Sequence, residues 1–369
     1  DISSEMIHPV LPSFVEAFWA TALAIGLVGG VGDLTQNVLK APSGYLSDRT
    51  GRRKALTAAG YAISATSKLF MPFSSAWAHV MALRASERAG KGVRTAPRDA
   101  LIAESAGARG MAFGLHRALD TLGAVVGSSA ALALLLTLGW SPRDIILAGA
   151  LLAFVALLPL AFVKEMGARP SKMEKWRRPG LPPEFKVFLL VATIFGLSNM
   201  TYMLFILFAL RFVEPPWGLD PLVFATALYL LFNIFYAVLS IPSGVLSDRI
   251  GRRAVIALGY AIFSLTCLGF SAPGPLAGQV PVAVGLFSLY GASRALIDGT
   301  QRAYASDLAP EEAKGYALGI FHTCVGLASL ASGVIVGLLW DLVGPSWAFA
   351  YAAVLSAISA LLLLALCRR

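Results

Sequence analysis

Charge is scarce in this sequence. Only 14% of its 369 residues are Asp, Glu, Lys or Arg, whereas a soluble globular domain carries about 25%. Hydrophobic residues make up 57% of the chain. This balance excludes a disordered protein and an ordinary cytosolic enzyme, because it favours lipid as the solvent. At about 20 residues for each membrane-spanning helix, a chain of this length holds about twelve spans.

Cysteine and histidine are rare as well. The three cysteines lie singly in apolar stretches, which excludes a disulfide scaffold and a paired metal-binding motif. The sequence has no cleavable signal pattern, and it has no phosphate-binding or dinucleotide-binding loop. We therefore expect no enzymatic activity and no resident cofactor or metal. The chain begins at Asp1 with a short apolar stretch, so we expect the first helix to be truncated.

Apolar stretches of spanning length form two sets of six, and helices are the element that spans a membrane at these lengths. The sequence predicts a six-helix N-terminal half over 1–163, a polar linker over 164–186 and a six-helix C-terminal half over 187–369. The spans are expected at about 1–15, 18–47, 54–74, 78–97, 110–138, 144–163, 187–210, 221–247, 254–273, 280–303, 315–340 and 347–366.

Lysine and arginine gather on one side of this predicted topology. Of the 30 basic residues, 21 fall in one set of connections, two in the opposite set and seven within predicted helices. Because positive loops face the cytoplasm, both termini and the linker are predicted to be cytoplasmic, in a multi-pass protein of the inner (plasma) membrane. The net charge of +9 is then a topology signal and a contact with anionic lipid, and no nucleic-acid partner is expected.

One segment occurs twice, 200 residues apart. The first copy, 42–53, reads PSGYLSDRTGRR and the second, 242–253, reads PSGVLSDRIGRR, with ten of twelve positions identical. The two halves are therefore predicted to be parallel copies, as in one large class of transporters.

The repeated Gly-x-x-x-Asp-Arg-x-Gly-Arg-Arg pattern resembles the turn between the second and third helices of each half in the major facilitator superfamily. This resemblance covers the whole chain. It implies an all-α fold of twelve transmembrane helices in two pseudo-symmetric halves, secondary transport of a small-molecule substrate by alternating access, and a monomer. It also implies that the first turn latches the outward-open state through ion pairs between the halves, and that this latch breaks on inward opening. The gating residues are predicted to be Gly44, Asp48, Arg49, Gly51, Arg52, Arg53, Gly244, Asp248, Arg249, Arg252 and Arg253.

Charged residues within the predicted helices are concentrated in the N-terminal half, with eleven there against two in the C-terminal half. Ionisable residues inside a membrane are costly and are functional candidates by default. We expect the N-terminal half to carry proton coupling and polar recognition, opposite an aromatic wall that includes Tyr202, Phe205 and Tyr229. The candidate cavity residues are Asp1, Glu5, His8, Asp33, Asn37, Lys40, Arg84, Arg88, Arg117, Asp120, Asn199, Asn233, Arg294 and Asp298.

Glu5 and Asp120 are the predicted proton-binding carboxylates, each able to pair with Arg88 or Arg117. The alternative is a fixed ion-pair network that only stabilises the N-terminal half. Arg294 and Asp298 are interpreted as a structural pair, because their i, i+4 spacing places them on one helix face. Lys91 and Arg94 are expected nearer the cytoplasm, in contact with headgroups or water.

The fifth predicted helix carries Gly114, Gly123 and Gly127. This spacing resembles a motif of drug/proton antiporters, although Ser128 stands where that motif has proline. The resemblance favours proton-coupled export of a small amphipathic compound, and ordinary packing of small residues is the alternative. Other readings are a divalent-metal transporter that uses Asp1, Glu5 and His8 as ligands, an organic-anion transporter, a lipid flippase and a sensor that does not transport.

Overall fold

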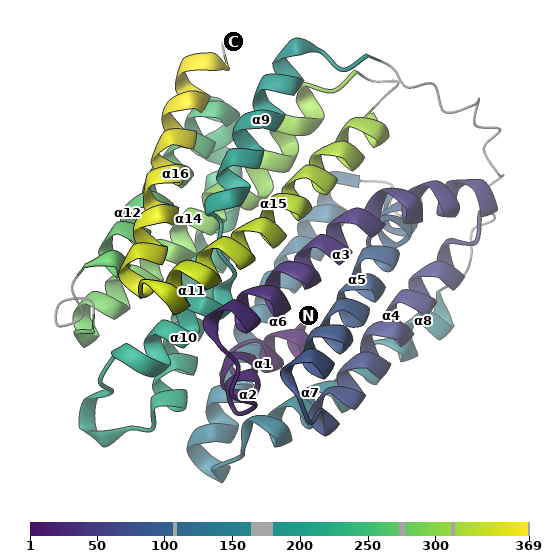
Figure 1. Ribbon diagram of the computed structural model, residues 1–369. Helices are drawn as coiled ribbons and strands as arrows, with labels where there is room; N and C mark the ends of the chain where they lie inside the picture. The colour runs from purple at the N-terminus through teal and green to yellow at the C-terminus, as the bar shows by residue number, and fades with distance from the viewer. Residues whose placement is uncertain (106–108, 164–179, 273–277, 311–313, 368–369) are drawn as a thin grey trace.

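The computed structural model describes residues 1–105, 109–163, 180–272, 278–310 and 314–367, without the side chains of 103–114 and 117. The regular elements in these ranges are all helices. They form the predicted fold of two six-helix halves, seen as the purple-to-blue and the teal-to-yellow parts of Figure 1.

In the N-terminal half the first and sixth spans are each made of two short helices. The first consists of α1 (Ile2–Ile7) and α2 (Leu11–Glu16), and the sixth of α7 (Pro142–Val155) and α8 (Leu157–Phe162). The second to fifth spans are continuous. They are α3 (Ala22–Thr50), α4 (Arg53–Phe70), α5 (Trp77–Ser105) and α6 (Arg109–Leu138), with the short turn η1 (Met71–Phe73) after α4.

In the C-terminal half the seventh span is divided into α9 (Pro183–Ser198) and α10 (Tyr202–Phe212), followed by the turn η2 (Pro216–Gly218). The remaining spans are continuous helices. They are α11 (Pro221–Ile250), α12 (Arg252–Ser271), α14 (Val280–Asp307), α15 (Lys314–Leu342) and α16 (Pro345–Leu366).

The divided spans differ from the single helices that we expected. Proline accounts for two of the breaks: Pro9 follows His8 at the end of α1, and Pro159 lies within α8, just after the break at Ala156. Proline removes a helical hydrogen bond and disfavours helical geometry in the residue before it. The seventh span begins at Pro183, four residues before the predicted start, and most of the predicted linker, 164–179, lies outside the described residues.

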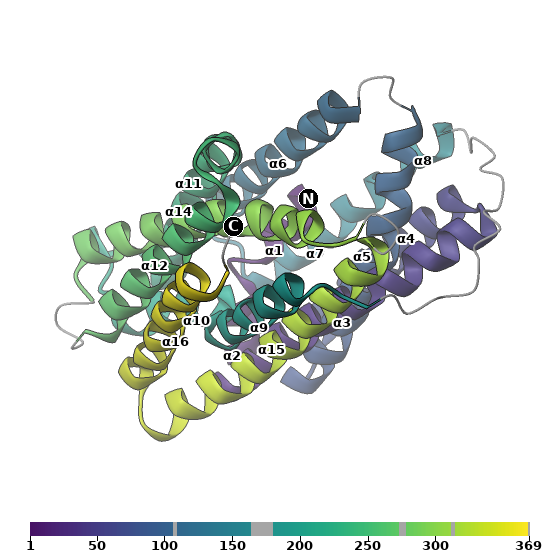
Figure 2. The ribbon, with the colours of Figure 1, turned by 90° about the horizontal axis from the view of Figure 1, so that it is seen from above.

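The halves contact each other mainly through two helix pairs, α3 with α15 and α6 with α11. Helices α3 and α15 run side by side in both ribbon views (Figures 1 and 2). Gly26 of α3 and Gly333 of α15 permit this approach, because a Cβ atom on either glycine would collide with the backbone carbonyl of the other.

The halves are closed at the end of the molecule opposite the repeated Arg-rich turns. There Arg211 of α10 forms an ion pair with Glu16 of α2 at 2.7 Å, and Asp341 of α15 accepts from the backbone of α3. Hydrogen bonds between described residues of the two halves are found at this end and in the middle of the molecule.

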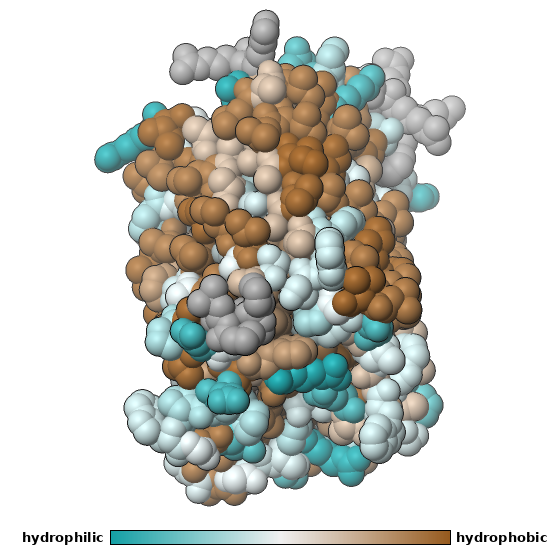
Figure 3. Space-filling view, turned by 60° about the vertical axis from the view of Figure 1, so that its left-hand side comes forward, coloured by the Kyte–Doolittle hydropathy of each residue, from teal (hydrophilic) through white to brown (hydrophobic). Residues whose placement is uncertain are grey.

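The surface fits a lipid environment. Figure 3 shows a broad apolar band, with hydrophilic residues concentrated towards one end. Within the described ranges, nine spans are long and apolar enough to cross a membrane by composition. The first span and helices α4 and α5 are absent from this set, because the first span is too short and the other two are less apolar. Trp19 and Trp217, both almost fully exposed, lie beyond α2 and α10, and tryptophan is enriched where a membrane meets water.

Candidate functional site

Each half begins with a broken helix, and a polar residue stands at each break. His8 ends α1, and Asn199 ends α9. Discontinuous helices at the middle of a transporter expose polar groups that bind substrates and ions. The sequence predicts both residues as cavity residues but does not predict the breaks, although the proline after His8 is a usable signal.

An arginine from the fourth span of each half contacts the residue at that half's break. In the N-terminal half, Arg84 and Arg88 of α5 approach Nε2 of His8 at 3.1 and 3.3 Å. In the C-terminal half, Arg294 of α14 donates to Oδ1 of Asn199 at 2.9 Å. The two halves thus repeat one arrangement, which the sequence repeat did not reveal because the residues at the breaks differ.

The arginines determine the tautomer of His8. A guanidinium group can only donate hydrogen bonds, so Nε2 of His8 must accept and carries no proton in this arrangement. In a neutral ring the proton then lies on Nδ1, which is 3.3 Å from Oε1 of Glu5 and 3.3 Å from the hydroxyl of Tyr229. His8 therefore connects the two arginines to Glu5.

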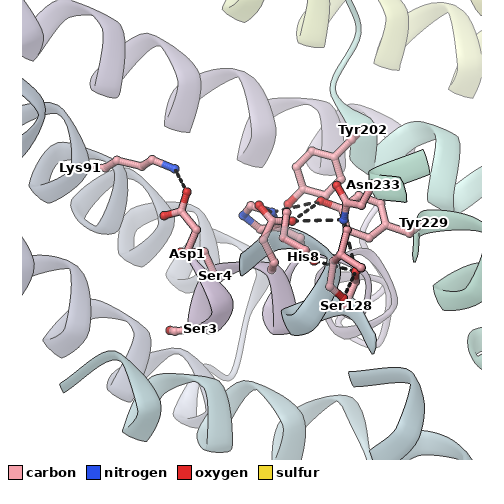
Figure 4. A network of polar contacts seen from close by, with 12 residues as sticks. Asp1, Ser3, Ser4, His8, Lys91, Ser128, Tyr202, Tyr229 and Asn233 are labelled. Carbon is pink, nitrogen blue, oxygen red and sulfur yellow. Dashed lines mark hydrogen bonds and ion pairs between the residues drawn. The ribbon is translucent and has the colours of Figure 1, made fainter. Parts of the chain in front are cut away.

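Glu5 of α1 joins the two halves. Its Oε2 atom accepts a hydrogen bond of 2.9 Å from the hydroxyl of Tyr229 and a longer contact of 3.5 Å from Nδ2 of Asn233, both on α11. Asn233 also contacts the hydroxyl of Ser128 on α6 at 3.4 Å. Figure 4 shows Tyr229, Asn233 and Ser128 gathered around His8. A carboxylate of one half thus accepts hydrogen bonds from the other half deep inside the molecule.

Arg84 and Arg88 share a single carboxylate. Glu87 is 1% exposed and lies 3.1 Å from Arg84 and 3.5 Å from Arg88. Other donors of the two arginines contact neutral groups, which are the hydroxyl of Tyr202 at 3.2 Å and the side-chain oxygen of Gln36 at 3.0 Å. Arg88 therefore pairs with Glu87 in this conformation, and it reaches Glu5 only through His8.

We expected Lys91 and Arg94 to contact headgroups or water. In the structure both side chains instead contact polar groups of the N-terminal half. Arg94 is 5% exposed, donates to the hydroxyl of Ser64 at 3.0 Å and lies 4.3 Å from the ring centre of Tyr61. Lys91 lies 3.9 Å from Asp1. Both side chains belong to the polar interior of the N-terminal half because α4 and α5 pack closely along this stretch.

The predicted aromatic wall is only partly correct. Tyr202 and Tyr229 face the N-terminal half and contact Arg84 and Glu5 there. Phe205 is fully buried and stacks on Tyr290 with ring centres 4.2 Å apart. Its side chain therefore belongs to the core of the C-terminal half and cannot line a cavity between the halves.

On the polar face of α3, one residue, Asp33, has no hydrogen bond or ion pair within the described part of the chain. Asn37 accepts from Lys40 at 2.7 Å, and Gln36 accepts from Arg88. Asp33 is half-buried and makes neither a hydrogen bond nor an ion pair with the described part of the chain. In the C-terminal half, by contrast, Asp298 pairs with Arg294 at 2.8 Å.

The three residues of the metal alternative do not gather around one point. Asp1 points towards Lys91, as Figure 4 shows, whereas Glu5 and His8 contact each other. Among the described residues, no three His, Cys, Asp or Glu side chains are placed to hold a metal ion. Asp120 is half-buried and interacts electrostatically with Lys91. The side chain of Arg117 lies outside the described residues.

In this conformation the ion pairs of the Arg-rich turns lie within each half. Asp48 pairs with Arg53 of its own half at 3.3 Å. In the second copy, Arg252 contacts Asp248 at 3.6 Å and also pairs with Asp307, again within one half. These turns lie at the end of the molecule opposite the contacts that close the halves.

The glycines of the two turns have separate roles. Gly51 and Gly251 adopt positive φ angles of 66° and 94°, which glycine allows without strain, and they end α3 and α11. Gly44 faces Ala96 of α5, where a Cβ atom would lie 3.4 Å from the alanine methyl group. Of the remaining turn residues, Arg49 and Arg249 are exposed, and Arg253 donates to the carbonyl of Cys367.

Comparison with known proteins agrees with this architecture. A family model described as "Major Facilitator Superfamily" matches residues 1–220 and 189–369. An uncharacterized MFS-type transporter of Methanocaldococcus jannaschii is 44% identical over 368 residues, covering 99% of this chain and 91% of the relative. An uncharacterized protein of Mycobacterium tuberculosis is 26% identical over 354 residues, covering 93% of this chain and 84% of the relative.

Solved transporters share the fold at low sequence identity. The nucleoside transporter NupG superposes with a TM-score of 0.81 at 13% identity, covering 100% of this chain and 98% of its own. A peptide transporter, POT, gives a TM-score of 0.82 at 12% identity, covering 99% and 91%. A human organic anion transporter gives 0.66 at 17% identity, covering 98% and 95%. These likenesses concern the fold alone.

Proposed function

Because this chain belongs to the Major Facilitator Superfamily, we propose that it is a proton-coupled secondary transporter that exports a small amphipathic organic compound by alternating access. The observation that supports coupling is the position of Glu5, whose carboxylate accepts hydrogen bonds from Tyr229 and Asn233 across the interface between the halves. The glycine spacing on α6, which resembles drug/proton antiporters, supports export.

The proton and the contact between the halves compete for the same carboxylate. Oε2 of Glu5 accepts from Tyr229 at 2.9 Å, and a proton on that oxygen would turn an acceptor into a donor. Separation of α1 from α11 frees the oxygen to take a proton from that side. Closure restores the bond with Tyr229 and returns the proton towards the Arg-rich side, while the substrate moves in the opposite direction.

His8 transmits this change to the arginines. Nδ1 of His8 faces Glu5, and its Nε2 accepts from Arg84 and Arg88. A change of charge on Glu5 therefore alters the imidazole that holds the two guanidinium groups. The proton site and the polar groups of α5 are connected through one ring.

The Arg-rich end is the cytoplasmic end in this proposal, because positive loops remain inside. The contacts between the halves lie at the other end and in the middle. The conformation described above is then the inward-facing one. The repeated turns form their contacts across the halves in the outward-facing conformation, in which the Arg-rich ends approach each other.

A distance measurement on the protein without substrate tests the coupling. Spin labels at Thr50 and Ile250, exposed at the Arg-rich ends of α3 and α11, report the separation of the halves in nanodiscs. The three native cysteines are replaced first. We expect the inter-label distance to change between mildly acidic and mildly alkaline pH, and we expect Glu5→Gln to remove that change.

The control is Glu184→Gln, which neutralises an exposed carboxylate at the start of α9. It should leave the pH response intact. Once a substrate is known, Glu5→Gln should abolish transport driven by a pH gradient and preserve substrate exchange. A pH response of Glu5→Gln equal to that of the unmodified protein would contradict the assignment of Glu5.

A further inference from the structure

We propose that Asp33 of α3 binds the protonated amine of an organic cation carried by this transporter. The inference rests on the transport function proposed above and names its substrate class. It begins from one observation. Asp33, a carboxylate within the second span, makes no hydrogen bond or ion pair with the described part of the chain.

The other interior carboxylates have partners. Glu5 accepts from Tyr229, Glu87 pairs with two arginines, and Asp298 pairs with Arg294. A charge inside a membrane protein costs several kcal/mol unless it is paired or hydrated. Asp33 is half-buried, so its carboxylate remains accessible to a ligand that supplies the missing partner.

Asp33 faces the space between the halves. One turn earlier on the same helix face, Gly29 lies against Thr201 at the start of α10, where a Cβ atom would collide with the threonine side chain. Arg88 of the N-terminal half interacts electrostatically with Asp33, and so do Arg294 and Tyr202 of the C-terminal half. A ligand at Asp33 would therefore contact both halves, as the substrate of an alternating-access transporter must.

Neither nearby arginine is available to Asp33. Arg88 is engaged with Glu87, Gln36 and His8, and Arg294 is engaged with Asp298 and Asn199. Neither arginine forms an ion pair with Asp33 in the described part of the chain. The carboxylate of Asp33 therefore still lacks a direct partner, despite the two arginines near it.

An amine fits this position better than the other ligand classes. An ammonium group brings a compensating charge and N–H donors to a carboxylate. A hydroxyl group would bring no opposite charge to Asp33, and an anion would be repelled by it. A divalent metal ion needs several oxygen ligands, and the described residues offer no group of three acidic, His or Cys side chains.

Three compounds with one carbon skeleton test the charge requirement. Phenethylamine is cationic, phenylethanol is neutral and phenylacetate is anionic near neutral pH. Each is added at millimolar concentration to the purified protein in detergent, and the melting temperature is measured. A ligand that binds the folded state raises this temperature. We expect a rise with phenethylamine alone, and we expect Asp33→Asn to abolish it while Glu184→Gln retains it.

Two results would overturn the proposal. If phenethylamine gives no rise in the unmodified protein, or an equal rise in Asp33→Asn, Asp33 is not an amine site. A rise with phenylacetate alone would instead indicate anion binding at the arginines. The pH response of the spin-label distances can persist in either case, so failure of this inference is distinguishable from failure of the coupling proposed for Glu5.

A second measurement applies even if Asp33→Asn does not fold. Asn37, one turn from Asp33 and half-buried, is replaced by cysteine in a chain without native cysteines. We expect the cationic reagent aminoethyl methanethiosulfonate to react about tenfold faster than its anionic sulfonatoethyl analogue, after correction for their rates with a free thiol. Lys40 lies one turn further and favours the anion, so faster reaction of the anionic reagent would contradict a cation site at Asp33.

Discussion

Asp341 of α15 caps the first turn of α3 in the other half, accepting the backbone N–H of Ala22 at 2.9 Å. Its second oxygen accepts the N–H of Leu23, also at 2.9 Å. The first backbone N–H groups of a helix have no partner within the helix, and a carboxylate there also interacts favourably with the helix dipole. The cap exists only while the halves are closed at this end, so it stabilises that conformation selectively.

Replacing this cap should open the end that it closes. Loss of a helix N-cap costs about 1 kcal/mol, so Asp341→Ala should shift the equilibrium between closed and open forms about fivefold towards opening at this end. Spin labels at Trp19 and Trp217, both exposed, would report this shift. Asp220→Ala is the matched control, since Asp220 caps α11 within its own half. An equal shift in both variants would show that Asp341 is not a latch.

The crossing of α3 and α15 gives a second prediction. Gly333→Ala places a methyl group against the backbone of Gly26, where no flexible side chain can move aside. We expect this variant to lower the melting temperature or to separate the halves at the closed end. Gly285→Ala on α14 has no neighbour within 4 Å among the described residues, so it should be neutral or stabilising. A melting temperature of Gly333→Ala at or above that of Gly285→Ala would contradict the close contact.

The sequence was sufficient for the fold because its two main signals are long and local. Apolar stretches of spanning length predicted twelve helices, and the copied segment at 42–53 and 242–253 predicted two parallel halves. The break at His8 was missed because helix continuity was inferred from apolar length alone. The break after Asn199 lies in a stretch without proline between Ser198 and Phe212, so hydrophobic patterning gave no signal for it.

The pairing of charges was less predictable. Helix faces can be assigned from sequence, but the partner of each side chain depends on how neighbouring helices are rotated and how closely they approach. Arg94 is an example: Gly60 and Gly90 bring α4 and α5 so close that Arg94 is enclosed against Tyr61. Asp33 is the converse case, since its lack of a partner is evident only once the surrounding helices are placed.

Glu87 gives a prediction about stability. It is buried and pairs with both Arg84 and Arg88, so Glu87→Gln leaves two buried guanidinium groups without a compensating charge. Removal of one partner from a buried ion pair costs about 3–5 kcal/mol. We expect a marked loss of melting temperature and of folded yield in detergent, which the exposed substitution Glu184→Gln does not produce. Similar melting temperatures for the two variants would mean that the arginines find other partners.

The hydroxyl of Tyr229 offers the most direct test of the bond between the halves. Tyr229→Phe removes the donor to Glu5 and retains the ring. A hydrogen bond to a charged group contributes about 1.5–3 kcal/mol, so the closed form should lose at least about tenfold in population relative to the open form.

Tyr260→Phe is the control, because the hydroxyl of Tyr260 bonds Gln301 within the C-terminal half. The labels at Thr50 and Ile250 should move closer together in Tyr229→Phe alone, because opening at one end brings the Arg-rich ends together. Unchanged distances in that variant would show that Glu5 does not hold the halves together through Tyr229, and the competition between this bond and the proton would then have no structural basis.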